Sequence, residues 1–134
     1  ISTNPENHAQ MGRTRQAKID QVANQIPLLQ VQGSADSDTL LVGWGSTEGH
    51  LLAAAKELHC ALAHFNYINP LPKNTAEVLR RYKRVIVCEL NNGQFAAYLR
   101  SKIQGIHFEQ YNEITAQPFA VERIVKAVQL IVNN

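Results

Sequence analysis

Short apolar runs alternate along most of this chain with segments whose apolar residues recur every three or four positions. Four of the runs predict strands: residues 39–44, His64–Ile68, Val85–Cys88 and Ile106–Tyr111. The third run is apolar at consecutive positions, which is typical of a central parallel strand that is buried on both faces. The fourth is more polar, and we therefore expect it nearer an edge of the sheet.

Helical spacing of apolar residues predicts a helix after each of these strands. The first runs from Glu48 to about His59, with a stripe formed by Leu51, Ala55, Leu58 and Leu62. The others are capped by Asn74 or Thr75, marked by Phe95, Leu99 and Ile103, and opened by Gln117-Pro118. Strands that alternate with helices imply an α/β fold with a parallel sheet and helices on both faces. The run Leu28–Gln32 is expected to add a fifth strand at an edge.

The first part of the chain has a different pattern. Residues 4–26 predict a polar helix, which Pro27 ends, and its apolar stripe is clear only in its second half. A helix that is polar at its start is typical of a connector between domains. We therefore expect a helical connector over residues 1–27 and one domain over residues 28–134. The chain starts at Ile1 rather than at a methionine, which indicates a piece of a longer protein.

Composition narrows the class of protein. The 134 residues are 45% hydrophobic and 18% charged, which is a globular composition for one domain. No apolar run approaches the roughly 18–20 residues that cross a bilayer, so no membrane association is expected. A net charge of +2 gives no argument for nucleic acid. Two cysteines are too few for a disulfide framework and favour a reducing, cytoplasmic location.

In a parallel sheet, ligands bind beyond the carboxyl ends of the strands. Three loops are expected there, and they are our candidate anion-binding or interface residues: Gly45, Ser46 and Thr47; Asn69 and Pro70; and Asn91, Asn92, Gly93 and Gln94. The first loop opens a helix, where free N–H groups favour an anion. A tight turn with an N-cap from Ser46 or Thr47 explains the same residues. Neither a P-loop nor a GxGxxG pattern is present.

Two further groups of residues allow a chemical interpretation. His59, Cys60 and His64 are metal-ligand types, but their spacing across a helix end and a strand start argues against convergence, and we predict no metal site. Cys88 precedes Glu89, but neighbouring strand residues point to opposite faces, so a buried, inert thiol is the simpler interpretation.

The other polar candidates are surface groups. His50 lies in the first turn of a helix without a visible partner, which favours a surface histidine over an acid or base. The basic cluster of Arg80, Arg81, Lys83 and Arg84 suits a helix end in solvent, with a docking patch for an acidic partner as the alternative. No catalytic residue is identified.

Taken in order, several segments resemble the C-terminal part of the α subunit of 2-oxoacid:ferredoxin oxidoreductases, most closely the 2-oxoglutarate type. Residues 5–8, Met11 and the basic residues up to Lys18 resemble the helical connector that follows the first domain of that subunit. The other matching segments are Leu41-Val42-Gly43-Trp44-Gly45-Ser46-Thr47, Tyr67-Ile68-Asn69-Pro70-Leu71-Pro72, Arg84-Val85-Ile86-Val87-Cys88-Glu89 with the following Asn-Gly-Gln, and Gln117-Pro118-Phe119.

The resemblance implies a three-layer α/β/α sandwich like the transketolase C-terminal domain, with a mostly parallel five-stranded sheet and one antiparallel edge strand. It implies a whole enzyme that uses thiamine diphosphate with Mg²⁺ and iron–sulfur clusters to convert a 2-oxoacid and coenzyme A, with ferredoxin as electron acceptor. The diphosphate-binding Gly-Asp-Gly pattern is missing here, and two cysteines cannot hold a cubane cluster. The resemblance therefore implies a non-catalytic assembly domain, without a cofactor of its own, that packs on the remainder of the α subunit and on other subunits.

Three alternatives remain open at this point. One is a transketolase-type domain of another thiamine-dependent enzyme, since a Gly-Ser-Thr strand end also occurs in such domains. A stand-alone module would hold an anion at Gly45-Ser46-Thr47. A small thiol enzyme would use Cys88 and requires that thiol to be reactive.

Overall fold

The computed structural model describes residues 15, 17–18, 21–90, 93–113 and 120–133 of the chain. Its five strands form one sheet in the order β1-β3-β2-β4-β5. Their bounds are Val31–Gly33 for β1, Thr39–Trp44 for β2, Ala61–Phe65 for β3, Arg84–Glu89 for β4 and Phe108–Asn112 for β5. β1 runs antiparallel to β3, and every other neighbouring pair is parallel. The prediction of a mostly parallel five-stranded sheet with one antiparallel edge strand is confirmed.

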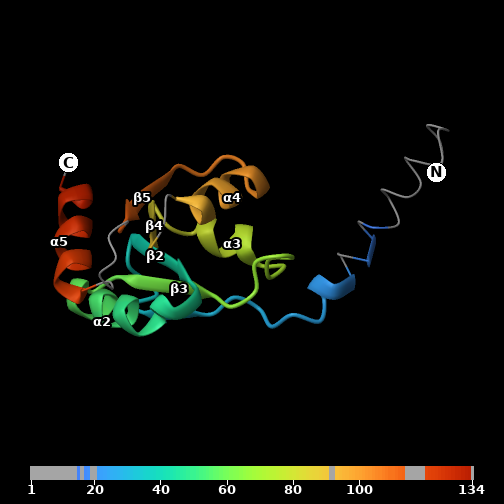
Figure 1. The fold of residues 1–134 in the computed structure, drawn as a ribbon, viewed down its shortest axis with the longest axis horizontal. Coiled ribbons are helices and arrows are strands. Elements are labelled where there is room, and N and C mark those ends of the chain that lie inside the picture. The colour runs from blue at the N-terminus through green and yellow to red at the C-terminus, as the bar shows by residue number, and fades with distance from the viewer. Residues whose placement is uncertain (1–14, 16, 19–20, 91–92, 114–119, 134) are drawn as a thin grey trace.

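Helices cover both faces of this sheet. They are the short 3-10 helix η1 (Gly45–Thr47), α2 (Glu48–Leu58), α3 (Thr75–Arg80), α4 (Gln94–Lys102) and α5 (Val121–Val132). In Figure 1, α2 and α5 lie on one side of the strands and α3 and α4 on the other. The predicted three-layer α/β/α sandwich is therefore confirmed.

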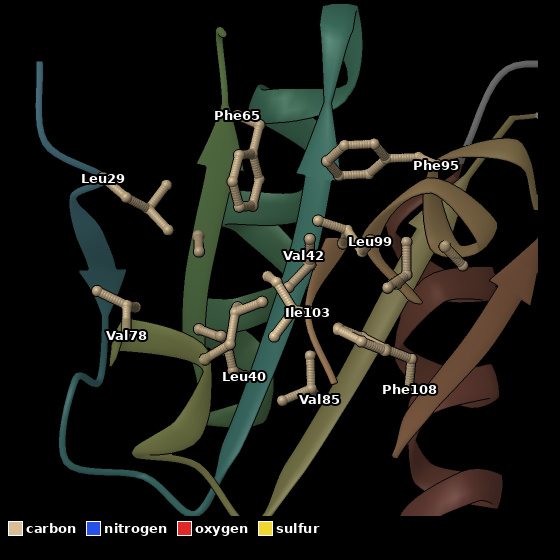
Figure 2. Packing of buried hydrophobic residues seen from close by; sticks show 14 of the residues in the cluster. Leu29, Leu40, Val42, Phe65, Val78, Val85, Phe95, Leu99, Ile103 and Phe108 are labelled. Carbon is tan, nitrogen blue, oxygen red and sulfur yellow. The ribbon is translucent and has the colours of Figure 1, made fainter. Parts of the chain in front are cut away.

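Each face of the sheet carries its own hydrophobic core, because successive strand residues point to opposite faces. In β2, Leu40 and Val42 belong to the cluster under α3 and α4, whereas Leu41 belongs to the cluster under α2 and α5. The first cluster gathers three phenylalanines and the aliphatic residues of the central strands, as Figure 2 shows for one side of the sheet. β2 and β4 are thus buried on both faces, as their consecutive apolar residues predict.

The prediction of a strand at His64–Ile68 is wrong: β3 is Ala61–Phe65. Helix α2 ends at Leu58, and the following residue, His59, adopts a left-handed conformation with φ 54°. All five residues of β3 are buried, because β3 pairs with β1 on one side and with β2 on the other. Leu62 continues the helical spacing of the preceding segment, and its small neighbours gave little strand signal, so the pattern placed this strand three residues late.

Two other strands begin later in the chain than the sequence pattern predicts. The strand expected at Leu28–Gln32 starts only at Val31, because the side-chain amide of Asn74 holds the Leu29 backbone through bonds of 2.8 and 3.1 Å. The strand expected at Ile106–Tyr111 is β5, at Phe108–Asn112, and it lies at the edge as predicted.

Two expectations fall partly on undescribed residues. The expected opening of the last helix at Gln117-Pro118 lies outside the described residues, and the described helix α5 begins at Val121. Of the helix expected over residues 4–26, residues 15, 17–18 and 21–26 are described. Residues 15, 17–18 and 21–23 are helical, whereas 24–26 form a turn and a bend, so the described helix ends at Ala23 rather than at Pro27.

Candidate functional site

The carboxyl ends of β2 and β4 flank the point where the topology of the sheet reverses. The chain passes from β2 to β3 on one side and then crosses to β4 on the other side of β2. Loops diverge at such a point, and this is where open α/β sheets bind ligands. A hollow of about 170 Å³ lies here, lined by Trp44, Gly45, Ser46, Thr47, Glu89 and Leu90. The structure therefore brings the first predicted loop to the switch point.

The Gly45-Ser46-Thr47 loop is a tight turn. Gly45 has a φ of 74°, a value that glycine adopts without strain. The Thr47 residue stands at the N-cap of α2, but its hydroxyl donates to the Trp44 carbonyl over 3.1 Å instead of capping the helix. Thr47 is buried, whereas Gly45 and Ser46 are exposed at the mouth of the hollow. The loop therefore presents two small exposed residues rather than a deep cradle.

Glu89 also lines the hollow, and it is the functional residue that the sequence patterns did not single out. Only 1% of it is exposed. Its two carboxylate oxygens accept the backbone N–H groups of Phe95, over 2.7 Å, and Ala96, over 3.0 Å. The N-terminus of α4 is thus occupied by the chain's own anion, where a helix favours negative charge. A signal was present in the sequence: an acidic residue at a strand end, followed by an Asn-Asn-Gly turn and a helix.

The remaining loop residues do not all gather at the switch point. Asn69 and Pro70, which are joined by a cis peptide bond, do not line the hollow. Gly93, at φ 86°, precedes Gln94, the first residue of α4. Asn91 and Asn92 lie outside the described residues.

Neither cysteine has the surroundings of a nucleophile. Burial raises the pKa of the Cys88 thiol to about 12 and that of Cys60 to about 11. Both cysteines are buried. Cys60 immediately precedes β3 and His64 lies within it, and four residues of extended chain separate the two by about 13 Å. Within the described residues, no three His, Cys, Asp or Glu side chains converge as a metal site.

The basic cluster is largely committed to contacts within the domain. Arg80 donates to the Gln104 carbonyl, Arg81 pairs with Glu77, and Lys83 lies 3.7 Å from Asp38. Arg84 binds both carboxylate oxygens of Glu109 over 3.0 Å and the Ile131 carbonyl over 2.9 Å, which ties β4 to β5 and to the end of α5. These contacts favour the structural interpretation of the cluster over a docking patch.

Comparison with known proteins places this fold in an enzyme family. The chain is 45% identical over 108 residues to the 2-oxoglutarate oxidoreductase subunit KorA of Mycobacterium tuberculosis, across 76% of the chain. It is 32% identical over 146 aligned residues to the α subunit of 2-oxoacid:ferredoxin oxidoreductase 1 of Aeropyrum pernix, across the whole chain. A solved 2-oxoglutarate:ferredoxin oxidoreductase from Magnetococcus marinus superposes on 96% of the chain with a TM-score of 0.84 and 27% identity.

The chain matches the C-terminal domain of a 2-oxoacid:ferredoxin oxidoreductase α subunit. It spans only 16% and 23% of the two curated relatives and 24% of the solved chain. No family model matches it. The Magnetococcus structure was solved with 2-oxoglutarate, coenzyme A and succinyl-CoA bound. Among the described residues of this α-subunit domain, no helix has the length and apolar character to span a membrane.

A first prediction concerns the two thiols of the α-subunit domain. We expect that neither Cys60 nor Cys88 of the folded chain reacts with iodoacetamide within an hour at pH 8, because the thiolate is the reactive form and burial raises both pKa values. The check is mass spectrometry of the labelled chain, with a urea-unfolded sample as the positive control. Rapid labelling of Cys88 in the folded chain would revive the thiol-enzyme interpretation.

Proposed function

We propose that this chain is a non-catalytic assembly domain of the α subunit of a thiamine diphosphate-dependent 2-oxoacid:ferredoxin oxidoreductase. The whole enzyme would convert a 2-oxoacid, 2-oxoglutarate in the first instance, and coenzyme A to acyl-CoA and CO₂ while it reduces ferredoxin. The observation that carries the proposal is the superposition of nearly the whole chain on an enzyme solved with 2-oxoglutarate, coenzyme A and succinyl-CoA. A cytoplasmic location is part of the same proposal.

The residues of this domain do not fit the cofactors of such an enzyme. The chain lacks a Gly-Asp-Gly diphosphate pattern, and its two cysteines are buried and protonated at neutral pH. Thiamine diphosphate, Mg²⁺ and the iron–sulfur clusters are therefore assigned to other parts of the enzyme.

The strand-end loops support a role in contacts between subunits more than a role in binding an anion. The switch-point hollow is small, about 170 Å³, and a buried carboxylate, Glu89, already lies on its wall. That carboxylate holds the N–H groups that an anion at the start of α4 would need. The exposed Gly45, Ser46 and Leu90 at the mouth suit a flat contact with another protein surface.

Co-expression tests the proposed function. The α subunit carrying this domain, co-expressed with the remaining subunits, is expected to form a complex that reduces viologen dye only with 2-oxoglutarate and coenzyme A. A subunit truncated before residue 28 should lose the complex, and the 134-residue chain alone should be inactive. Full assembly and activity without the domain, or activity of the chain alone, would contradict the proposal. Calorimetric titration of the chain with coenzyme A tests the anion-binding alternative, and heat of binding that disappears in Ser46→Glu, which repels an anion, would favour it.

A further inference from the structure

A second and larger hollow lies at the edge of the sheet beside the end of β3. It encloses about 460 Å³, and its walls are residues 27–30 together with His64, Asn66 and Tyr67, while Gln32, Glu48 and Pro72 complete the lining. It exists because the ladder between β1 and β3 stops at the pair Val31–Ala63, while Asn74 holds the preceding Leu29 backbone away from β3. The edge of β3 from His64 onward therefore faces the hollow.

His64 brings an unusual group to this hollow. Its side chain is only 2% exposed. The Nε2 atom lies 2.9 Å from the Gly45 carbonyl oxygen, which only accepts hydrogen bonds, so Nε2 carries the proton and donates it. The Nδ1 atom is buried and has no hydrogen-bond partner. In the neutral ring this atom is an acceptor, and a buried acceptor without a donor is rare in folded proteins.

A carboxylate oxygen near the Nδ1 atom of His64 narrows the kind of ligand that fits the hollow. The Oε2 atom of Glu48 lies 3.6 Å from the Nδ1 atom of His64 and accepts a hydrogen bond from the Gln32 amide over 3.0 Å. Two acceptors thus converge on one side of the hollow, and its lining includes one carboxylate and no Lys or Arg. A donor that reaches both acceptors at once satisfies the imidazole and neutralises the carboxylate.

The mouth of the hollow indicates what kind of molecule brings that donor. Leu28 and Tyr67 are large apolar residues that stand 47% and 48% exposed at its rim. A half-exposed aromatic ring that lines the same hollow as a carboxylate suits a guanidinium, which stacks on rings and donates several N–H groups in one plane. Aromatic residues and arginine are enriched together at protein–protein interfaces.

We propose that this hollow receives an arginine side chain from a neighbouring subunit of the assembled enzyme. The guanidinium donates to the Glu48 carboxylate and, as that half-exposed side chain shifts toward it, to the otherwise buried Nδ1 atom of His64, while its plane lies against Tyr67. The inference rests on the proposed function, because it names one surface through which the domain assembles. It places that surface around the start of α2 and the end of β3.

The test replaces Glu48 by glutamine, which keeps the size of the side chain and removes its charge. Glu57→Gln is the matched control, because it makes the same change at an exposed position of the same helix, outside the hollow. In the co-expressed complex at 0.15 M salt, Glu48→Gln is expected to raise the dissociation constant of the subunits about tenfold, as loss of a charged partner does at an interface. Glu57→Gln is expected to leave it unchanged.

Each other outcome has a distinct meaning. Equal dissociation constants for wild type and Glu48→Gln would overturn the inference while the proposed function survives. A wild-type domain that does not associate at all would instead overturn the proposed function. Thermal unfolding of the chain tests whether Glu48 instead stabilises the fold by an internal ion pair with His64. If Glu48→Gln lowers the Tm by more than about 4 °C relative to Glu57→Gln, Glu48 has that internal role and the inference is wrong.

Discussion

Replacing Glu89 by glutamine is expected to lower the free energy of unfolding by about 2–3 kcal/mol, although the side chain keeps its size. The buried carboxylate accepts two backbone N–H groups at the start of α4, one on each oxygen. An amide has only one acceptor oxygen, so its NH₂ group would face a second N–H donor in a buried position. The charge that complements the helix dipole is lost as well. The measurement is urea unfolding of the purified chain followed by circular dichroism.

The matched variant for this experiment is Glu77→Gln. Glu77 forms an exposed i,i+4 pair with Arg81, in which the two side chains are 70% and 57% exposed. Such a pair contributes a few tenths of a kcal/mol, so we expect a change below about 0.5 kcal/mol. If the two variants unfold at the same urea concentration, then Glu89 does not act as the anion of the α4 N-terminus.

Gly33→Ala is the second substitution with a large expected effect. Gly33 ends β1 at a φ of 73°, and a Cβ atom there would lie 2.7 Å from the Cys60 carbonyl oxygen. That oxygen belongs to the backbone and accepts the Ser34 N–H over 3.1 Å, so it cannot move aside without loss of the bond. We expect Gly33→Ala to lower the free energy of unfolding by about 3 kcal/mol. Left-handed backbone strain contributes about 1 kcal/mol of this, and the clash contributes the rest.

Gly105→Ala separates these two contributions. Gly105 has a similar φ of 82°, but a Cβ atom there meets nothing within 4 Å. Gly105→Ala is therefore expected to lower the free energy of unfolding through backbone strain alone, by about 1 kcal/mol. Chemical unfolding of both variants measures the difference, and equal losses would mean that the approach of β1 to the Cys60 carbonyl is not tight.

Apolar periodicity predicts most of the strands and helices of this fold, and the elements that it misplaces have physical causes. β2 and β4 are buried on both faces, so their apolar runs are unambiguous. β3 is also buried, but its two alanines carry little β preference, and Leu62 falls in helical register with the preceding stripe. The helix ends instead where His59 turns left-handed, and histidine gives no strong signal for that conformation.

The candidate site was only partly predictable. The position of Gly45-Ser46-Thr47 at the switch point follows from the order of elements, which the sequence contains. The role of Glu89 depends on how the start of α4 lies against the end of β4, and apolar periodicity does not describe this arrangement. The hollow beside His64 depends on Asn74 and Leu29, which lie 45 residues apart. Such contacts between distant loops leave no local pattern in a sequence.

The strand order has a consequence for synthesis of the protein. The strands β1, β2 and β3 lie together at one end of the sheet, whereas β4 and β5, which come later in the chain, complete the other end. As the chain leaves the ribosome, β1, β2 and β3 can pair before β4 has been synthesised. The apolar edge of β2 that later pairs with β4 is unpaired during that time. An unpaired apolar edge is the feature through which nascent chains aggregate. We therefore expect the yield of this domain to depend on the speed of translation between residues 65 and 84 and on chaperones that cover that edge.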